Sequence, residues 1–324
     1  MKGILRWLDG FQQRHAVIAF PVAVVKKFGD DQAGNLAALI AYYGFFSLFP
    51  LLLVLVTVLG MVLRSNPDLQ TSILDSALAN FPVIGDQISR NVHGLEGTGV
   101  TLAVGIALTL WSGLGVIKAT QTAMNAVWNV PFEHRPNFLT STLRALIMLG
   151  VLGVLTLASA VAGSIGGGSG RWWLVILGLA VSLVMNLFLF LVTFRTLTSE
   201  HLTWGEVLPG AAVGSAAWTT LHALGGYYVS HQLQGASEVY GGFAIVVGLL
   251  AWILIGAAVT LLAAEINVVR KRHLWPRSLV QPPFTDADVQ ALTRYAKQEE
   301  RRPEERIDVE VEGRRWDEGR SATP

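Results

Sequence analysis

The sequence predicts an all-α, polytopic membrane protein built around six transmembrane helices. Of its 324 residues, 52% are hydrophobic and only 15% are charged, and the mean hydropathy is +0.48. Soluble domains carry about 25% charged residues, so the composition is that of a membrane protein. None of the long apolar stretches alternates between polar and apolar residues as membrane β-strands do, which leaves helices as the predicted spanning elements.

Six apolar stretches are long enough to span a membrane, because a helix needs about 20 mainly apolar residues to cross the hydrocarbon core. They cover approximately residues 36–63, 100–119, 145–163, 172–197, 207–229 and 242–268. The first lies within 32 uncharged residues between Asp31 and Arg64, more than one crossing requires. Tilt of this helix, or a kink at Pro50, is the predicted consequence.

The distribution of Lys and Arg predicts the orientation of these spans, since cytoplasmic connections retain positive charge. Basic residues gather before the first span, in the second connection, beside the fourth connection and after the sixth span: Lys2, Arg6, Arg14, Lys26, Lys27, Arg135, Arg144, Arg195, Arg270, Lys271, Arg272 and Arg277. The first, third and fifth connections are poor in them, and the fifth has none. We therefore expect both termini in the cytoplasm.

The segments outside the spans divide the chain into three parts. Residues 1–30 place apolar side chains at helical spacing among Lys, Arg and Gln, which predicts an amphipathic helix in the cytoplasmic interface. The transmembrane domain covers 31–275, and its first external connection, 64–99, is predicted to contain one or two short helices. Residues 276–324 are rich in charges of both signs, which predicts a disordered cytoplasmic tail with one short helix near 286–300.

Polar residues in three of the spans are the candidate functional residues. Lys118, Gln121 and Asn125 share one helical face, and Glu265 lies among apolar residues, where a charged side chain costs about 2.5 to 3.5 kcal/mol to insert. The predicted orientation brings the candidates together in the inner half of the membrane. They are predicted to line a cytoplasm-facing polar cavity: Asn35, Tyr42, Lys118, Gln121, Asn125, Glu265 and Asn267.

Simpler roles for these residues stay open. Lys118 can pair with Glu265, or its side chain can extend to the membrane interface. Glu265 can instead pair with Arg270 or support helix packing. The GxxxG spacing of Gly210 and Gly214 predicts close packing of the fifth span against a neighbouring helix.

Enzyme chemistry lacks a recognisable constellation of residues. The chain has no Cys, and its seven His form no HExxH or HxH motif. It also has no Walker loop and no GxSxG motif. We expect no enzymatic activity, no cofactor and no bound metal. The mixed charge of the tail gives no nucleic-acid-binding patch.

Four stretches carry a resemblance to a known family: NLAALIAYYGFFSLFPLLL from Asn35, WSGLGVIKATQTAMNAVWNV from Trp111, VYGGF from Val239 and LLAAEIN from Leu261. The chain resembles the YihY/BrkB family of bacterial inner-membrane proteins. The resemblance implies a six-helix inner-membrane protein with cytoplasmic termini, and a link to virulence and serum resistance. Some members have carried the label ribonuclease BN, but the lack of a metal-ligand set argues against that activity here. The family supplies no settled catalytic residues.

Two functions of different classes follow. In the first, the chain is a secondary transporter or exporter of a small solute, with Glu265 as the group that couples to a proton or ion. In the second, it is a structural or envelope-assembly membrane protein whose polar residues only join helices. Membrane lipid is an expected partner in both, and a solute and a coupling ion only in the first. The oligomeric state stays open, and a ribonuclease is a distant third hypothesis.

Overall fold

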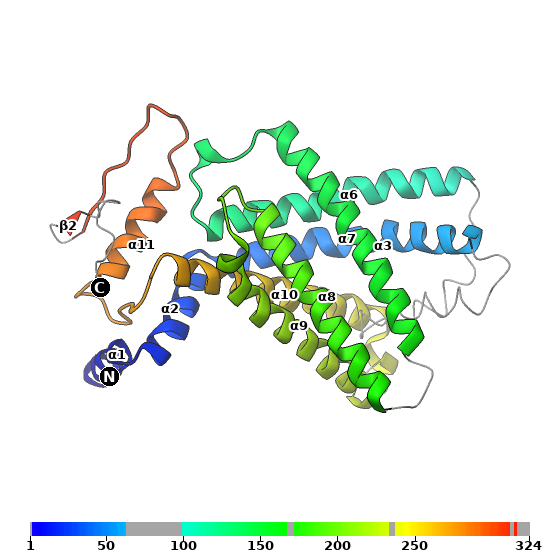
Figure 1. The fold of residues 1–324 in the computed structure, drawn as a ribbon, viewed down its shortest axis with the longest axis horizontal. Helices are drawn as coiled ribbons and strands as arrows, with labels where there is room; N and C mark the ends of the chain where they lie inside the picture. Colours follow the sequence, from blue (N-terminus) through cyan, green and yellow to red (C-terminus); the bar gives the residue numbers. More distant parts are fainter. Residues whose placement is uncertain (1, 63–98, 167–171, 233–236, 312–313, 316–324) are drawn as a thin grey trace.

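A computed structural model describes residues 2–62, 99–166, 172–232, 237–311 and 314–315 (Figure 1). Two short helices, α1 (Lys2–Arg14) and α2 (Ala16–Asp30), precede the apolar part of the chain. The helices predicted in the first external connection, the glycine-rich turn between the third and fourth spans and the end of the tail lie outside the described residues.

Six long helices correspond to the six apolar stretches. They are α3 (Ala33–Val62), α6 (Gly99–Val127), α7 (Phe138–Gly166), α8 (Trp172–Thr196), α9 (Trp204–Gln232) and α10 (Ser237–Lys271). Among the described residues, three stretches are long and apolar enough to cross a membrane, namely Ala103–Val127, Phe138–Leu155 and Val246–Lys271, and shorter apolar helices cover Ala33–Leu48 and Ala180–Thr196. The mostly helical class is therefore confirmed. α3 continues as a helix through Pro50, and its kink stays a prediction.

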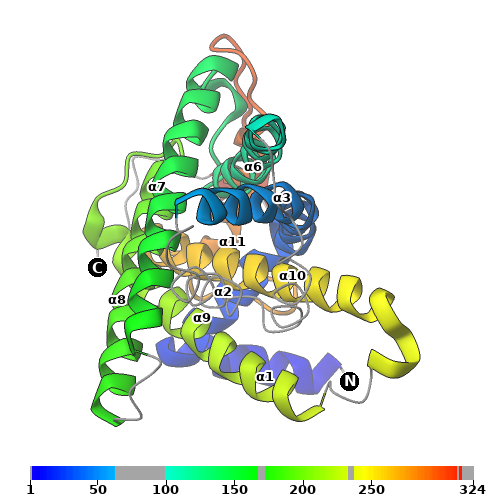
Figure 2. The same ribbon diagram turned by 90° about the vertical axis from the view of Figure 1, so that its right-hand side faces the viewer.

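Helix α10 occupies the centre of the bundle. It packs against α2, α3, α6 and α9, and it lies between α3 and α9 when the molecule is turned (Figure 2). The remaining neighbours follow chain order, with α7 against α6 and α8, and α8 against α9. The buried core is densest where α6 and α10 end, at Met124, Val127, Trp128, Leu261, Val268 and Val269.

Glycines permit close helix contacts at two places. A Cβ on Gly115 of α6 would lie 2.7 Å from the Tyr43 ring of α3, so the helices meet where only a glycine fits. A Cβ on Gly214 of α9 would lie 3.0 Å from Cβ of Ala263 on α10, and a Cβ on Gly210 would collide with the Ala263 carbonyl. This is the close packing that the GxxxG spacing predicts.

The N-terminal segment differs from the single interfacial helix that we expected for residues 1–30. The helix breaks at His15, and α2 packs against α10 with Ala19, Ala23 and Lys27 buried at four-residue spacing. Small side chains at that spacing allow α2 to approach the bundle closely. α1 keeps an amphipathic, exposed character, with Trp7 and Phe11 on its surface, and α2 exposes Val17 and Val25 on the face away from the bundle.

The C-terminal segment contains the short helix that the sequence predicts near residues 286–300, but it is not the disordered tail that we expected from residue 276. It folds back to form α11 (Asp286–Lys297), whose N-cap Thr285 makes a capping box with Asp288. Two short strands follow, β1 (Glu310–Val311) antiparallel to β2 (Arg314–Arg315). α11 lies beside α2 at one end of the bundle (Figure 1), and an ion pair between Lys26 and Asp288 holds it there. A hydropathy profile cannot predict such a contact between charged residues.

Candidate functional site

A buried ammonium group connects three helices, α2, α6 and α10, at the end of the bundle where α6 and α10 terminate. Lys27 of α2 is 0% exposed, and its Nζ lies 3.3 Å from Oε2 of Glu265 on α10. The same Nζ pairs with Asp31, at the C-terminal end of α2, and donates a hydrogen bond of 2.8 Å to the carbonyl of Val127 at the end of α6. We call Lys27, Asp31 and Glu265 the lysine cluster.

The lysine cluster contains two carboxyl groups and one ammonium group. The side chain of Glu265 is 0% exposed, and that of Asp31 is 2% exposed. Within the described part of the chain, neither oxygen of Glu265 accepts a hydrogen bond, so its contact with Lys27 is an ion pair without hydrogen-bond geometry. Burying an incompletely paired charge is costly, and the cluster therefore has a free-energy reason to bind a proton or a cation.

Helix α11 covers the lysine cluster from the side of the tail. The Tyr295 ring centroid lies 5.8 Å from Nζ of Lys27, and Asn129 donates to Oε1 of Gln298 at 3.0 Å. Burial, and then the negative charges of Asp31 and Asp30, raise the pKa of Tyr295 well above its ordinary value. Its hydroxyl therefore keeps its proton, and no described residue forms a hydrogen bond with it.

A second set of ion pairs fastens α11 to α2, and we call it the tail clasp: Lys26, Asp30, Arg277, Ser278 and Asp288. The Asp288 carboxylate accepts hydrogen bonds from Nε of Arg277 at 2.6 Å, Nζ of Lys26 at 3.0 Å and the backbone N–H of Ser278 at 3.0 Å. Nη2 of Arg277 also reaches Asp30 at 2.8 Å. Burial raises the pKa of Asp288, but hydrogen bonds from Ser278 and Arg277 outweigh it and hold that pKa well below the ordinary value.

Helix α1 takes part in the same fastening. Asp9 accepts hydrogen bonds from the backbone N–H groups of Leu279, at 2.9 Å, and Val280, at 3.3 Å. Gln12 donates to the carbonyl of Arg277 at 2.7 Å. The N-terminal helices and the segment before α11 therefore form one polar unit at this end of the bundle.

The structure brings only one of the seven predicted site residues into the lysine cluster. Glu265 pairs with Lys27 and not with Lys118, which lies over the Phe138 ring at 4.0 Å from the ring centroid. Asn35 is exposed, and its side-chain amide donates a hydrogen bond to the Gln32 side chain. Tyr42 is 56% exposed on the surface of α3.

The other three predicted residues join elements of the fold. Oδ1 of Asn267 accepts the N–H of Gly210 at 2.7 Å, which links α10 to α9. Oδ1 of Asn125 accepts the N–H of Ser199 at 2.8 Å, which links α6 to the connection between α8 and α9. Gln121 accepts the hydroxyl of Ser141 at 2.6 Å, which links α6 to α7. These contacts match the simpler packing role that the sequence left open.

Sequence reasoning missed Lys27 and Asp31, which it treated as charges flanking the first span. Two signals were present. Lys27 continues the four-residue spacing of Ala19 and Ala23, so it belongs to the buried face of α2. Lys27 and Asp31 are themselves four residues apart, a spacing that favours a pair within one helix.

The long apolar helices define a helical membrane protein, and two buried ionic clusters lie at one end of its bundle. No group of three or more His, Asp or Glu side chains within the described ranges is arranged to hold a metal ion. The chain belongs to the virulence factor BrkB family, whose model matches residues 24–286. No solved structure matches the chain.

Curated relatives place this family in the membrane. The chain is 27% identical to the inner membrane protein YhjD of Escherichia coli over 78% of its own length and 81% of the relative. It is 27% identical to a UPF0761 membrane protein of Stenotrophomonas maltophilia, over 81% of this chain and 63% of that one. It is 25% identical to YfkH of Bacillus subtilis, whose name describes it as ribonuclease-like, over 80% and 98%. The chain is a multi-pass inner-membrane protein.

Proposed function

We propose that the chain crosses the inner membrane six times, with both termini in the cytoplasm. Six long helices and the alternation of Lys and Arg between connections support this topology. The two terminal segments also lie at the same end of the bundle (Figure 1), as an even number of spans requires. The lysine cluster then lies at the cytoplasmic end of the bundle.

We further propose that the protein transports a small solute and that the lysine cluster couples this transport to a proton or ion. One observation carries the proposal: the cluster holds one carboxyl group more than it holds ammonium groups, and Glu265 belongs to the candidate span Val246–Lys271. Ionisable residues in such positions usually line ion or proton pathways. Because Glu265 is fully buried, this arrangement corresponds to a closed inner gate, with α2 and α11 as the elements that move to open it.

Transport by purified protein in liposomes tests this proposal. Liposomes loaded with a pH-sensitive dye are held at an inside-alkaline pH gradient and challenged with a panel of amino acids, sugars and organic acids. Wild-type protein is expected to couple the movement of at least one solute to the pH gradient. Glu265→Gln is expected to abolish the coupling, because the amide cannot release a proton. The matched control Glu304→Gln, in the exposed part of the tail, should retain it.

Full coupling in Glu265→Gln would show that the site is wrong. Glu265→Gln should also fold, since removing the surplus carboxylate leaves Lys27 paired with Asp31. Its free energy of unfolding is expected to stay within about 1 kcal/mol of the wild-type value. Normal folding together with lost coupling would separate a functional role for Glu265 from a structural one.

A structural or envelope-assembly role is the second candidate. The observation that favours it is that Gln121, Asn125 and Asn267 each join two elements of the fold. This role predicts no solute movement for any member of the panel. It also predicts that Asn267→Ala lowers stability by about 1 kcal/mol, the net contribution of an ordinary hydrogen bond.

A further inference from the structure

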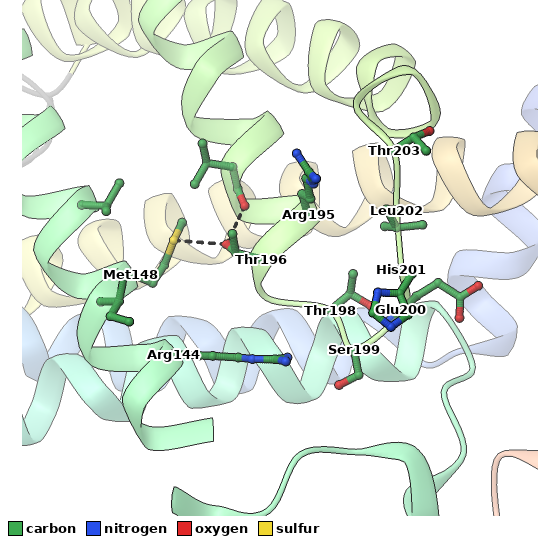
Figure 3. Close-up of a pocket in the computed structure, with 13 residues that line it drawn as sticks. Arg144, Met148, Arg195, Thr196, Thr198, Ser199, Glu200, His201, Leu202 and Thr203 are labelled. Carbon is green, nitrogen blue, oxygen red and sulfur yellow. Dashed lines mark hydrogen bonds between the residues drawn. The ribbon is translucent and has the colours of Figure 1, made fainter. Parts of the chain in front are cut away.

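A pocket of about 580 Å³ lies away from the lysine cluster, between α7, α8 and the connection 197–203 that leads into α9. Arg144, Ile147 and Val151 line it from α7, and Val192 and Arg195 line it from α8 (Figure 3). Arg144 extends toward Ser199 on the connection. The pocket therefore combines apolar helix walls with two guanidinium groups.

The positive charge of this pocket is not neutralised from within. Arg144 has no carboxylate within ion-pair distance among the residues that the structure describes. The guanidinium of Arg195 stacks on the Trp204 ring at 4.3 Å, a contact that leaves its N–H edge available for an anion. Glu200 is the one lining carboxylate, and it faces Lys271 and Arg272, each at 3.7 Å. An anion is the ligand that this charge distribution favours.

Apolar stripes lead away from both arginines. On α7, Ile147, Val151 and Val154 follow Arg144 at helical spacing, and Ile147 and Val154 are 60% and 68% exposed. On the antiparallel α8, Val184, Phe188 and Val192 precede Arg195 on one face, and Val184 is 64% exposed. Both stripes begin at the arginines and run in the same direction along the bundle. A ligand that fits both parts has an anionic head and apolar chains.

The connection that closes the pocket is held in place by the rest of the protein. Asn125 accepts the N–H of Ser199, and Glu200 reaches the basic end of α10. Thr196 donates to the carbonyl of Val192 at 2.6 Å, and its hydroxyl lies 3.4 Å from the sulfur of Met148, so α7 and α8 are joined beside the connection (Figure 3). The wall of the pocket is thus held in place by the protein itself, and the Trp204 ring holds Arg195 beside it.

We propose that this pocket binds an anionic phospholipid, with Arg144 and Arg195 contacting the phosphate and the two stripes contacting the acyl chains. Guanidinium groups match phosphate oxygens in geometry and charge. Basic pockets between transmembrane helices at the cytoplasmic side bind anionic lipid head groups by the same chemistry. The site is separate from the lysine cluster and needs no transport activity.

Native mass spectrometry of the full chain in detergent tests the proposal, with phosphatidylglycerol and phosphatidylcholine as probes. Wild-type protein is expected to bind phosphatidylglycerol in preference to phosphatidylcholine. The double variant Arg144→Gln/Arg195→Gln should weaken phosphatidylglycerol binding at least about tenfold, the effect of losing a charge-assisted hydrogen bond. The matched control Arg302→Gln, on the exposed tail, should bind as the wild type does.

Competition distinguishes a lipid from a soluble phosphate. Inorganic phosphate or glycerol phosphate at millimolar concentration should displace little phosphatidylglycerol, because neither occupies the apolar stripes. Displacement by either one at low concentration would overturn the lipid assignment in favour of a soluble anion. Unchanged phosphatidylglycerol binding in the double variant, with thermal unfolding like that of the wild type, would overturn the site itself.

Discussion

Two buried carboxylates at the same end of the molecule differ in how completely they are satisfied. Asp288, in the tail clasp, receives Arg277 and Lys26 as well as the N–H and hydroxyl of Ser278 and of Thr285. Glu265, in the lysine cluster, forms an ion pair with Lys27 at 3.3 Å and lies beside the Asp31 carboxyl group, and it accepts no hydrogen bond from the residues that the structure describes. Both side chains are 0% exposed, so the difference lies in their partners and not in their burial.

The comparison separates a carboxylate with a structural role, Asp288, from a carboxyl group with a candidate functional role, Glu265. A carboxylate that receives several hydrogen bonds and two cations holds its charge at little cost, and it fixes the geometry around it. A buried carboxylate that shares one cation with a second carboxylate costs stability, which is the condition under which a proton or ion binds. The tail clasp therefore holds α11 in place, and the lysine cluster is the candidate functional site that α11 covers.

The largest effect is expected from Lys27→Met, which leaves Asp31 and Glu265 buried without a cation. Removing one partner of a buried ion pair costs about 3 to 5 kcal/mol. Lys118→Met is the matched control, because Lys118 loses only a contact with the Phe138 ring, worth below about 1 kcal/mol. Unfolding in detergent by titration with dodecyl sulfate measures both values.

Equal stability losses in Lys27→Met and Lys118→Met would contradict the contrast between the two carboxylates. If Lys27→Met does not fold, the triple variant Lys27→Met/Asp31→Asn/Glu265→Gln serves in its place. It carries no buried charge in the cluster, and it should regain most of the lost stability.

A smaller and more local effect is expected from Asp288→Asn. The substitution weakens the hydrogen bonds with Arg277 and Lys26, each a bond to a charged group, at a cost of about 1.5 to 3 kcal/mol. α11 should detach from α2 while the long helices stay folded, so limited trypsin digestion should remove the tail first. Asp308→Asn, on an exposed side chain, is the control. Loss of tail and bundle together in one transition would contradict a separate fastening.

The smallest effect is expected from acid, and it separates the tail clasp from the rest of the fold. The folded pKa of Asp288 is lowered below its ordinary value of 3.8, so its stabilising contribution is present above about pH 4 and is lost as pH falls through the lowered pKa. The chain contains no Cys, so a spin label at Leu292→Cys, on the exposed face of α11, would be unique. Label mobility should stay constant from pH 7 to pH 4 and rise only below it. A rise in label mobility between pH 7 and pH 5 would show that a group other than Asp288 controls the attachment of α11.

Long uncharged runs determine helices of matching length, which is why the sequence predicts the six long helices well. The burial of Glu265 is also predictable, because four apolar or small residues surround it in LAAEIN. The partner of Glu265 is harder to find, because Lys27 lies 238 residues away and resembles an ordinary flanking charge. The tail clasp cannot be predicted from hydropathy for the same reason. Lys26 and Asp288 are 262 positions apart, and both belong to charged segments.

The pairing of Lys27 with Glu265 also sets an order on the making of the protein. A ribosome adds about 5 to 20 residues per second, so Glu265 is synthesised some 10 to 50 s after Lys27. Throughout that interval α2 has no carboxylate from α10 to meet, and the N-terminal helices cannot complete their packing. Packing of the N-terminal helices is therefore completed only when the last span is made. A chain interrupted before residue 265 leaves Lys27 and Asp31 without their contact on α10.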